Sequence, residues 1–225
     1  MARPIREDVR KLLQATCPFP CFVGFDHVDE IRALRKKGEP FLFADHAYFI
    51  RGHDVGNYRV IFNGIHQNRV LDVPDDRRAM FKAAFQAWRE PRETIVFIPA
   101  PKSIEQFYGD NWNAQALGEI AKATKRKVII KAKTDGNLRE YLKQAHCLVS
   151  HSSVAAVEAG CFGVPVFGPA TSPAYLIGES DLSQIENPVF PDRERWLNTL
   201  TYSQFTKQEI TSGFAWATVK ELNGV

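Results

Sequence analysis

Residues 149–167 bring together side chains that could bind a phosphorylated ligand. The segment reads VSHSSVAAVEAGCFGVPVF, in which an apolar strand meets small hydroxyl residues and a helix is expected over Ser153–Cys161. A helix N-terminus presents free N–H groups and the positive end of the helix dipole. The hydroxyls of Ser152 and Ser153 add donors there, so the pattern suits a diphosphate. Glu158, about one turn into the helix, is placed to accept hydrogen bonds from a ribose.

The same residues also have a purely structural interpretation. Ser153 is a common type of helix N-cap, and Glu158 can be an ordinary solvated charge. His151, just before the serines, either hydrogen-bonds a phosphate or the transferred group, or is a satisfied structural histidine. Spacing alone favours the structural interpretation of Ser153 and Glu158, because N-caps are frequent.

Basic residues follow two neighbouring predicted strands. Lys131 and Lys133 come at the end of the strand Lys127–Lys131, where they could neutralise a leaving diphosphate. Lys102 and Ser103 follow the strand Thr94–Ile98 and form a second loop at the same sheet edge. Ordinary surface lysines are the competing interpretation of these positions.

The elements that must position these residues follow a βαβ pattern. Apolar strands alternate with helices through residues 94–168, which predicts a parallel sheet with helices on both faces. In such sheets ligands bind beyond the carboxyl ends of the strands. The expected strands are Thr94–Ile98, Lys127–Lys131, Cys147–Ser150 and Val164–Phe167, and the expected helices are Asn111–Thr124, Asn137–Ala145 and Ser153–Cys161.

Residues 1–93 show a weaker pattern of the same kind. Pro91 interrupts the chain, so we place a boundary between a domain of residues 1–93 and one of residues 94–225. Helices at Arg193–Tyr202 and from Thr206, which with Glu209 forms a capping box, to about Asn223 are expected to close the second domain. The other expected elements are strands at Cys21–Phe25, Pro40–Ala44 and Tyr58–Phe62 and helices at Val28–Lys37 and Asp76–Arg89.

The string SSVAAVEAGCFGVPV resembles the donor-site signature of the GT-B glycosyltransferases. This resemblance covers roughly residues 94–170. It implies an α/β fold of two Rossmann-like parallel-sheet halves facing a cleft, here in a compact form. It also implies a nucleotide-sugar donor, such as a UDP-sugar, whose diphosphate meets the hydroxyl-rich turn and whose ribose is held by Glu158. The chain has no Asp-x-Asp motif, which agrees with the metal-independent transfer that the resemblance implies, with no cofactor besides the donor.

A second resemblance spans most of the chain. Small phage and bacterial proteins share the SxAAVEA…GVPVF run together with segments that read here IENP (185–188), DRERW (192–196) and SGFAW (212–216). This resemblance implies a phage-type setting. A hydroxymethylated base in phage DNA is therefore one expected acceptor, and a glycan is the competing one. A nucleotide-sugar epimerase and a non-catalytic nucleotide-binding or nucleic-acid-binding protein remain the alternative functions.

The N-terminal half is expected to supply the acceptor side and the base. An acceptor hydroxyl must lose its proton as the glycosidic bond forms, and a carboxylate or imidazole can take it. Asp45 and His46 follow the apolar run 41–44, and aromatic residues come next, so this pair is preferred over Asp26-His27. The proposed acceptor contacts, for which surface charges are the simpler interpretation, are Arg51, Arg59 and Asn63.

Composition excludes several other classes. Hydrophobic residues make up 44% of the 225 residues and charged residues 24%, which is typical of a globular protein. The net charge of +3 lies wholly in residues 1–93, with 16 Lys and Arg against 13 Asp and Glu. The charged N-terminus and the absence of a long apolar run predict a cytoplasmic protein without a membrane span. Four cysteines at unrelated spacings predict free thiols rather than a disulfide framework or a metal site.

Overall fold

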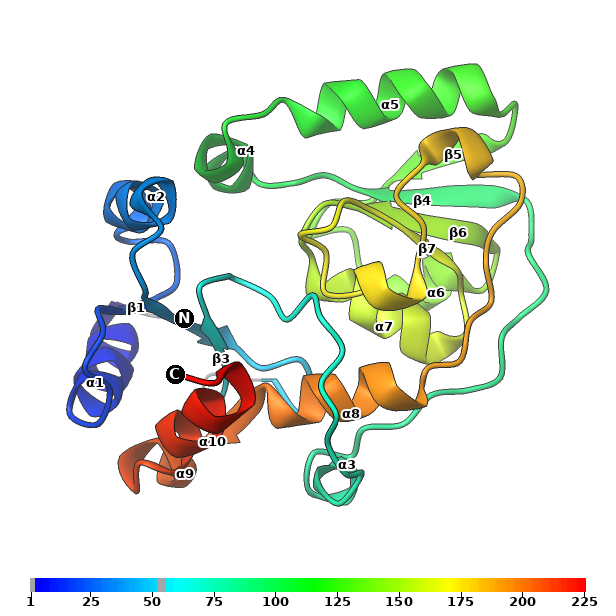
Figure 1. Cartoon of the computed structure of the whole chain (residues 1–225). Coiled ribbons are helices and arrows are strands. Elements are labelled where there is room, and N and C mark those ends of the chain that lie inside the picture. Colours follow the sequence, from blue (N-terminus) through cyan, green and yellow to red (C-terminus); the bar gives the residue numbers. More distant parts are fainter. Residues whose placement is uncertain (1–2, 52–55) are drawn as a thin grey trace. The chain divides into compact units, whose positions relative to one another are not determined.

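The computed structural model describes residues 3–51 and 56–225, which form a mixed α/β structure (Figure 1). The chain divides into two compact units, each described here by itself. Unit 1 comprises residues 1–67, 71–83 and 197–225, and unit 2 comprises residues 68–70 and 84–196. The division differs from the expected boundary after residue 93, because residues 84–93 belong to unit 2 and the C-terminal residues 197–225 return to unit 1.

Unit 2 is built on a four-stranded parallel sheet. Its strand order is β5-β4-β6-β7, and every neighbouring pair is parallel. Parallel pairing requires crossover connections, and the expected helices supply them. The strands are β4 (Thr94–Ile98), β5 (Lys127–Ile130), β6 (Ala145–Ser150) and β7 (Val166–Phe167).

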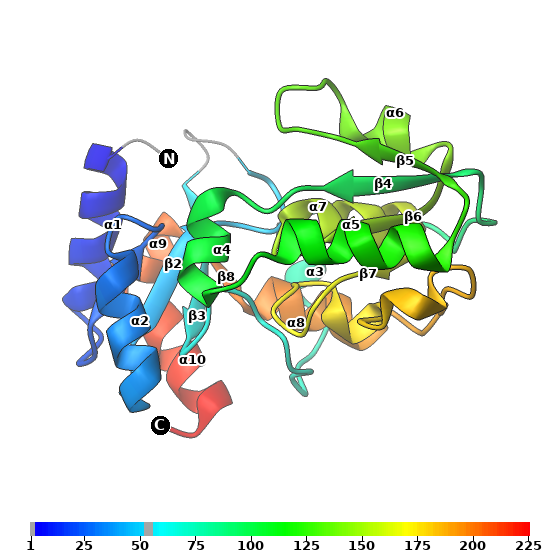
Figure 2. The ribbon, with the colours of Figure 1, turned by 90° about the horizontal axis from the view of Figure 1, so that it is seen from above.

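Helices cover both faces of this sheet. In Figure 1, α5 lies on one side, and α6 and α7 lie on the other; Figure 2 shows α5 running along the length of β4. Alternate side chains of β4 and β6, such as Ile95 and Cys147, form one buried cluster with Ala116 and Ile120 of α5. The helical elements are α4 (Lys102–Tyr108), α5 (Trp112–Ala123), α6 (Leu138–Leu142), α7 (Val154–Phe162) and the short 3-10 helices η1 (Tyr175–Ile177) and η2 (Leu182–Gln184).

Unit 1 contains a mixed sheet, which corrects the expectation of a second parallel, Rossmann-like half. The order is β1-β2-β3-β8; β1 and β2 are parallel, whereas β3 runs antiparallel to both β2 and β8. The connection from β2 to β3 is shorter than the dozen or more residues that a parallel crossover needs, so the two strands pair as a hairpin. The strands are β1 (Cys21–Val23), β2 (Leu42–His46), β3 (Asn57–Phe62) and β8 (Gln204–Thr206).

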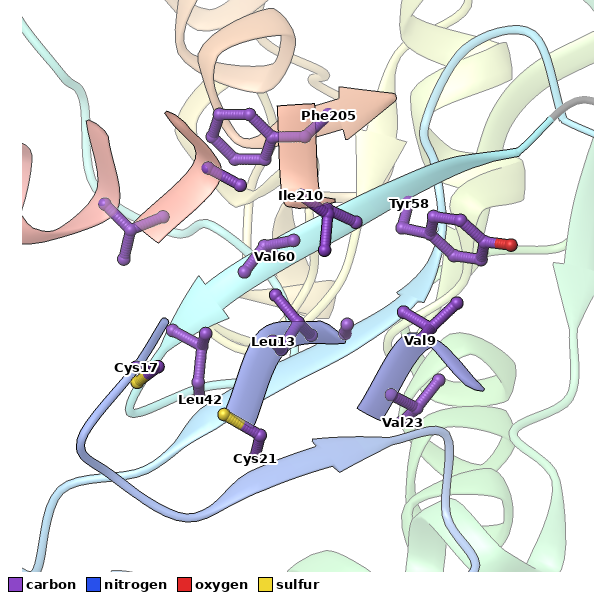
Figure 3. Packing of buried hydrophobic residues seen from close by; sticks show 13 residues of the cluster. Val9, Leu13, Cys17, Cys21, Val23, Leu42, Tyr58, Val60, Phe205 and Ile210 are labelled. Atoms are coloured by element: carbon purple, nitrogen blue, oxygen red, sulfur yellow. The ribbon is translucent and has the colours of Figure 1, made fainter. Parts of the chain in front are cut away.

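The core of unit 1 forms where a helix that the sequence analysis did not identify packs on this sheet. Val9 and Leu13 of α1 (Arg3–Gln14) meet Val23, Leu42 and Val60 from three strands, as Figure 3 shows. Cys17 and Cys21 are buried in the same cluster as free thiols. The remaining helices are α2 (Val28–Lys37), α3 (Arg77–Met80), α8 (Glu194–Tyr202), α9 (Lys207–Thr211) and α10 (Phe214–Asn223).

The helix expected over Asp76–Arg89 is wrong beyond its first turn. Only α3 forms, and the chain that follows is bound by tertiary hydrogen bonds instead. The amide of Gln86 donates to the carbonyl of Cys161 at 2.8 Å, and that of Arg89 donates to Gly163 at 2.7 Å. These bonds tie the segment to the end of α7, so its amides are not available to a helix.

The helix expected from Thr206 to Asn223 is divided in two. The capping box of Thr206 and Glu209 is confirmed, but α9 ends before Gly213, whose φ of +81° is left-handed. Both helices belong to unit 1 because β8, just before them, pairs with β3. Among the helices that the structure describes, none combines the length and apolar character needed to cross a bilayer.

Candidate functional site at the carboxyl edge of the parallel sheet

The order of the strands in unit 2 defines a switch point between β4 and β6. These strands are neighbours, but α5, which follows β4, and α7, which follows β6, lie on opposite faces of the sheet (Figure 1). Diverging connections leave a crevice beyond the carboxyl ends of two such strands, and ligands of open α/β sheets bind there. The serine-rich turn singled out in the sequence lies at this point.

The turn leads directly into α7, and Ser153 is its N-cap. Ser153 has an extended backbone, and its Oγ accepts a hydrogen bond from the amide of Ala155 at 3.2 Å. The N-cap predicted at Ser153 is therefore confirmed. Glu158 is half-buried on the same helix. Ser152 directly precedes the N-cap, and its hydroxyl is not the one that caps the helix.

The floor of this edge is closely packed. A Cβ atom on Gly168, directly after β7, would lie 2.3 Å from the carbonyl oxygen of Ser150 at the end of β6. Ser150 is fully buried, and its Oγ has no hydrogen-bond partner within the described part of the chain. Only a glycine at position 168 allows the two strand ends to approach this closely.

His151 is the centre of the polar contacts at this edge. Its side chain is 2% exposed. Its Nε2 lies 3.4 Å from Oδ2 of Asp110, and its Nδ1 lies 3.1 Å from Oγ of Ser152 and 3.4 Å from Oγ1 of Thr171. Burial lowers the pKa of the His151 imidazole below its usual value, and the carboxylate of Asp110 opposes this shift. Without a ligand the ring is therefore neutral at neutral pH.

Aromatic rings and hydrogen bonds fix the surroundings of His151. The ring of Tyr108 lies 4.8 Å from the imidazole and that of Trp112 lies 5.4 Å from it. Trp112 also stacks on Phe97 of β4. Asn113 holds both backbone polar groups of Ala100, at 2.7 and 2.9 Å, and thereby fixes the loop after β4.

Asp110 and Thr171 are site residues that the sequence analysis missed. Asp110 lies between α4 and α5, and Thr171 lies in the loop after β7, so three connections meet at His151. Two features of the sequence could have drawn attention to these residues: the turn residues around Asp110 and the GPATSP segment (168–173), which both follow the carboxyl ends of expected strands. Neither signal indicated a contact with His151.

The predicted basic residues occupy separate places. Lys102 and Ser103 are exposed in the first turn of α4. Lys131 is 6% exposed; its Nζ donates to the carbonyl of Ala132 at 3.0 Å and lies 5.5 Å from the ring centre of Tyr141. Lys133 is exposed in the loop that follows. The described contacts of Lys131 are therefore with its own loop and α6.

In unit 1, the proposed base Asp45 is part of an ion pair. Its Oδ2 lies 3.1 Å from Nη2 of Arg59, and its Oδ1 accepts from the amide of His46 at 2.8 Å. Arg59 is 4% exposed and also donates to the carbonyls of Ile65 and His46. Both oxygens of Asp45 and most of the guanidinium are thus committed within unit 1.

The other predicted residues of unit 1 have varied surroundings. Asn63 adopts a left-handed φ of 55°, and its Oδ1 accepts from the amide of Phe41 at 2.9 Å, which makes it a turn residue. Arg51 is exposed. Asp26 pairs with Arg6, and His27 lies 3.1 Å from Glu30 of α2, so that rival pair also has structural partners.

Comparison of the chain with protein-family models and with curated protein sequences finds no match. Among the described residues, no three His, Cys, Asp or Glu side chains are grouped so that they could hold a metal ion.

Proposed function

We propose that the protein is a glycosyltransferase that uses a nucleotide-sugar donor, such as a UDP-sugar, bound at the carboxyl edge of the unit 2 sheet. The observation that carries the proposal is the convergence of three loops on His151 beside the start of α7, at the switch point of the sheet. The resemblance of this segment to the GT-B donor signature supports the same assignment.

Each residue at this edge has a role in donor binding under the proposal. The amides at the start of α7 and the Ser152 hydroxyl bind the diphosphate, with His151 beside them. Glu158 accepts hydrogen bonds from the ribose. The exposed Lys133, Lys102 and Ser103 contribute positive charge and a hydroxyl around the leaving group, whereas the buried Lys131 is held by its own loop.

The acceptor chemistry is proposed for unit 1. An acceptor oxygen attacks the anomeric carbon and forms the glycosidic bond, while the bond from that carbon to the phosphate oxygen breaks. The nucleoside diphosphate leaves with the bonding electrons, and a base takes the acceptor proton. Of the Asp45-His46 pair, the imidazole of His46 is the proposed base, because Asp45 is engaged by Arg59. The exposed Arg51 is the cationic candidate on the acceptor side, which suits a hydroxymethylated base in DNA, whereas Arg59 is held by Asp45 and by two backbone carbonyls.

A panel of nucleotides and nucleotide sugars tests the donor site. A ligand present at 100 times its dissociation constant stabilises the folded state by about 2.7 kcal/mol, which thermal unfolding detects. The best donor is then incubated with hydroxymethylated DNA or with glycans in the presence of EDTA. Sugar transfer under these conditions supports the proposal. Conversion of the nucleotide sugar without an acceptor would indicate an epimerase, and stabilisation without turnover would indicate a binding protein.

A further inference from the structure

The Nδ1 atom of His151 has one lone pair and two hydroxyl neighbours. Oδ2 of Asp110 lies 3.4 Å from Nε2, and because a carboxylate can only accept, this contact favours the neutral tautomer with its proton on Nε2 and with Nδ1 as an acceptor. Ser152 and Thr171 then compete to donate to the same nitrogen, at 3.1 and 3.4 Å. At any moment one of these hydroxyl protons can be directed at the imidazole.

Protonation of His151 reverses this arrangement. An imidazolium donates from both nitrogens, so Nδ1–H would donate to an oxygen of Ser152 or Thr171 rather than accept from it. The hydroxyl proton previously directed at Nδ1 then turns toward another acceptor. A phosphate oxygen at the start of α7 is an acceptor of the appropriate charge, since Ser152 immediately precedes the N-cap.

We propose that binding of a phosphate group at the start of α7 is coupled to the uptake of one proton by His151. His151 is then a positioning residue that determines whether the Ser152 hydroxyl donates to the imidazole or to the ligand. Asp110 fixes the tautomer of the His151 ring, and the Thr171 hydroxyl competes with that of Ser152 for Nδ1. The inference rests on the proposed donor site and adds to it a dependence on pH.

The groups that face His151 agree with such coupling. The negative charges near it are Asp110, between α4 and α5, and Glu105 of α4. The other neighbours are the uncharged rings of Tyr108 and Trp112 and the hydroxyls of Ser152 and Thr171. Burial keeps the pKa of the imidazole low in the absence of ligand, so the ring has a proton to gain when a phosphate adds negative charge beside it.

Thermodynamic linkage between proton binding and anion binding sets the size of the pH dependence. The factor by which the anion raises the proton affinity of His151 equals the factor by which protonation tightens anion binding. We therefore expect binding to tighten about tenfold for each unit by which the pH falls, between the pKa values of the bound and free states.

Imidazole NMR of the full chain tests the coupling directly. Sulfate and inorganic pyrophosphate serve as probes, and sulfate stays a dianion across the range, so it adds no titration of its own. His151→Gln identifies the His151 signals among the six histidines. We expect the proton on Nε2 without anion and a pKa that rises when either probe is added. A pKa that neither probe moves overturns the inference.

Calorimetry with pyrophosphate compares wild type, His151→Gln and Asp110→Asn between pH 6 and pH 8. The His151→Gln protein should lose the part of the pH dependence of pyrophosphate binding that comes from His151. In Asp110→Asn that pH dependence should move to lower pH, because the carboxylate that raises the pKa of His151 is gone. The matched control is Glu119→Gln, an exposed residue of α5. A single cooperative thermal transition shows that each variant is folded.

The outcomes separate this inference from the proposed function. Proton-linked pyrophosphate binding without turnover of any nucleotide sugar would support the coupling and overturn the transferase proposal. Donor binding with the same pH dependence in wild type and His151→Gln would overturn the coupling alone. An absence of binding by either anion and by every nucleotide would overturn both.

Discussion

Asp45 and Arg59 lie directly opposite each other on β2 and β3, and their side chains form an ion pair at 3.1 Å. The guanidinium is almost fully buried, whereas the Asp45 side chain is 21% exposed. Arg59 also lies 5.8 and 5.9 Å from the ring centres of Phe43 and Tyr48. This pair therefore joins the two antiparallel strands through a buried charge.

Asp45→Asn should destabilise unit 1. The substitution removes a negative charge that compensates a buried guanidinium, and a hydrogen bond to a charged group contributes about 1.5–3 kcal/mol. Urea unfolding should show a loss of that size. Asp29→Asn is the matched control, because Asp29 is 92% exposed and lies 3.8 Å from Arg32 on the surface of α2. A transfer rate lowered about 10²–10⁴-fold at unchanged stability would instead make Asp45 the base.

Glu158→Gln should weaken nucleotide binding without unfolding the protein. The substitution keeps the size of a half-buried side chain and removes the charge that strengthens its hydrogen bonds to a ribose. A loss of about 1.5–3 kcal/mol corresponds to roughly 10- to 150-fold in the dissociation constant. Calorimetry measures the dissociation constant, and Glu119→Gln, at an exposed position of α5, is the control. Equal affinity in both variants would remove Glu158 from the site.

Two glycine-to-alanine substitutions in unit 2 should have opposite effects. At Gly168 the new Cβ would lie 2.3 Å from a backbone oxygen, so the strand ends must separate, at a cost of about 1–3 kcal/mol. At Gly118, inside α5, nothing lies within 4 Å of the new Cβ, and alanine should stabilise the helix by about 0.5–1 kcal/mol. Denaturant unfolding compares both. A Gly168→Ala protein as stable as wild type would contradict the close approach of β6 and β7.

Stability should fall as the pH drops from about 7 toward 5. Burial lowers the pKa of both His146 and His151 in the folded protein, so the unfolded chain binds protons that the native state does not. The stability that these rings contribute is present above the unfolded pKa of about 6.5 and is lost below it, by up to about 1.4 kcal/mol per pH unit for each ring. His146 adds to the effect because burial, which lowers the pKa of its imidazole, outweighs the opposing influence of the Ile185 carbonyl, 2.6 Å from Nε2.

Urea unfolding of wild type and His151→Gln at several pH values checks this expectation. The variant should retain only the part of the slope that comes from His146. A stability that is flat over this range in wild type would show that neither ring resists protonation in the folded state.

Local patterns were sufficient to predict the parallel unit. The apolar runs at β4, β5, β6 and β7 alternate with helical segments, and short connections leave the chain few other ways to bury both kinds of element. The helix at Ser153 and the capping box at Thr206 were also predictable, because their hydrogen bonds lie within a few residues of one another.

Only the tertiary structure decided the sheet of unit 1, the path of the segment after α3 and the contacts of His151. These features depend on contacts between residues far apart in the chain. β8 pairs with β3 and makes the unit 1 sheet mixed, and the segment after α3 bonds to the end of α7 instead of forming a helix. Asp110 and Thr171 become site residues only because folding brings three loops to His151. Asp45 looked available as a base, and it was the antiparallel register of β2 and β3 that placed the buried charge of Arg59 against it.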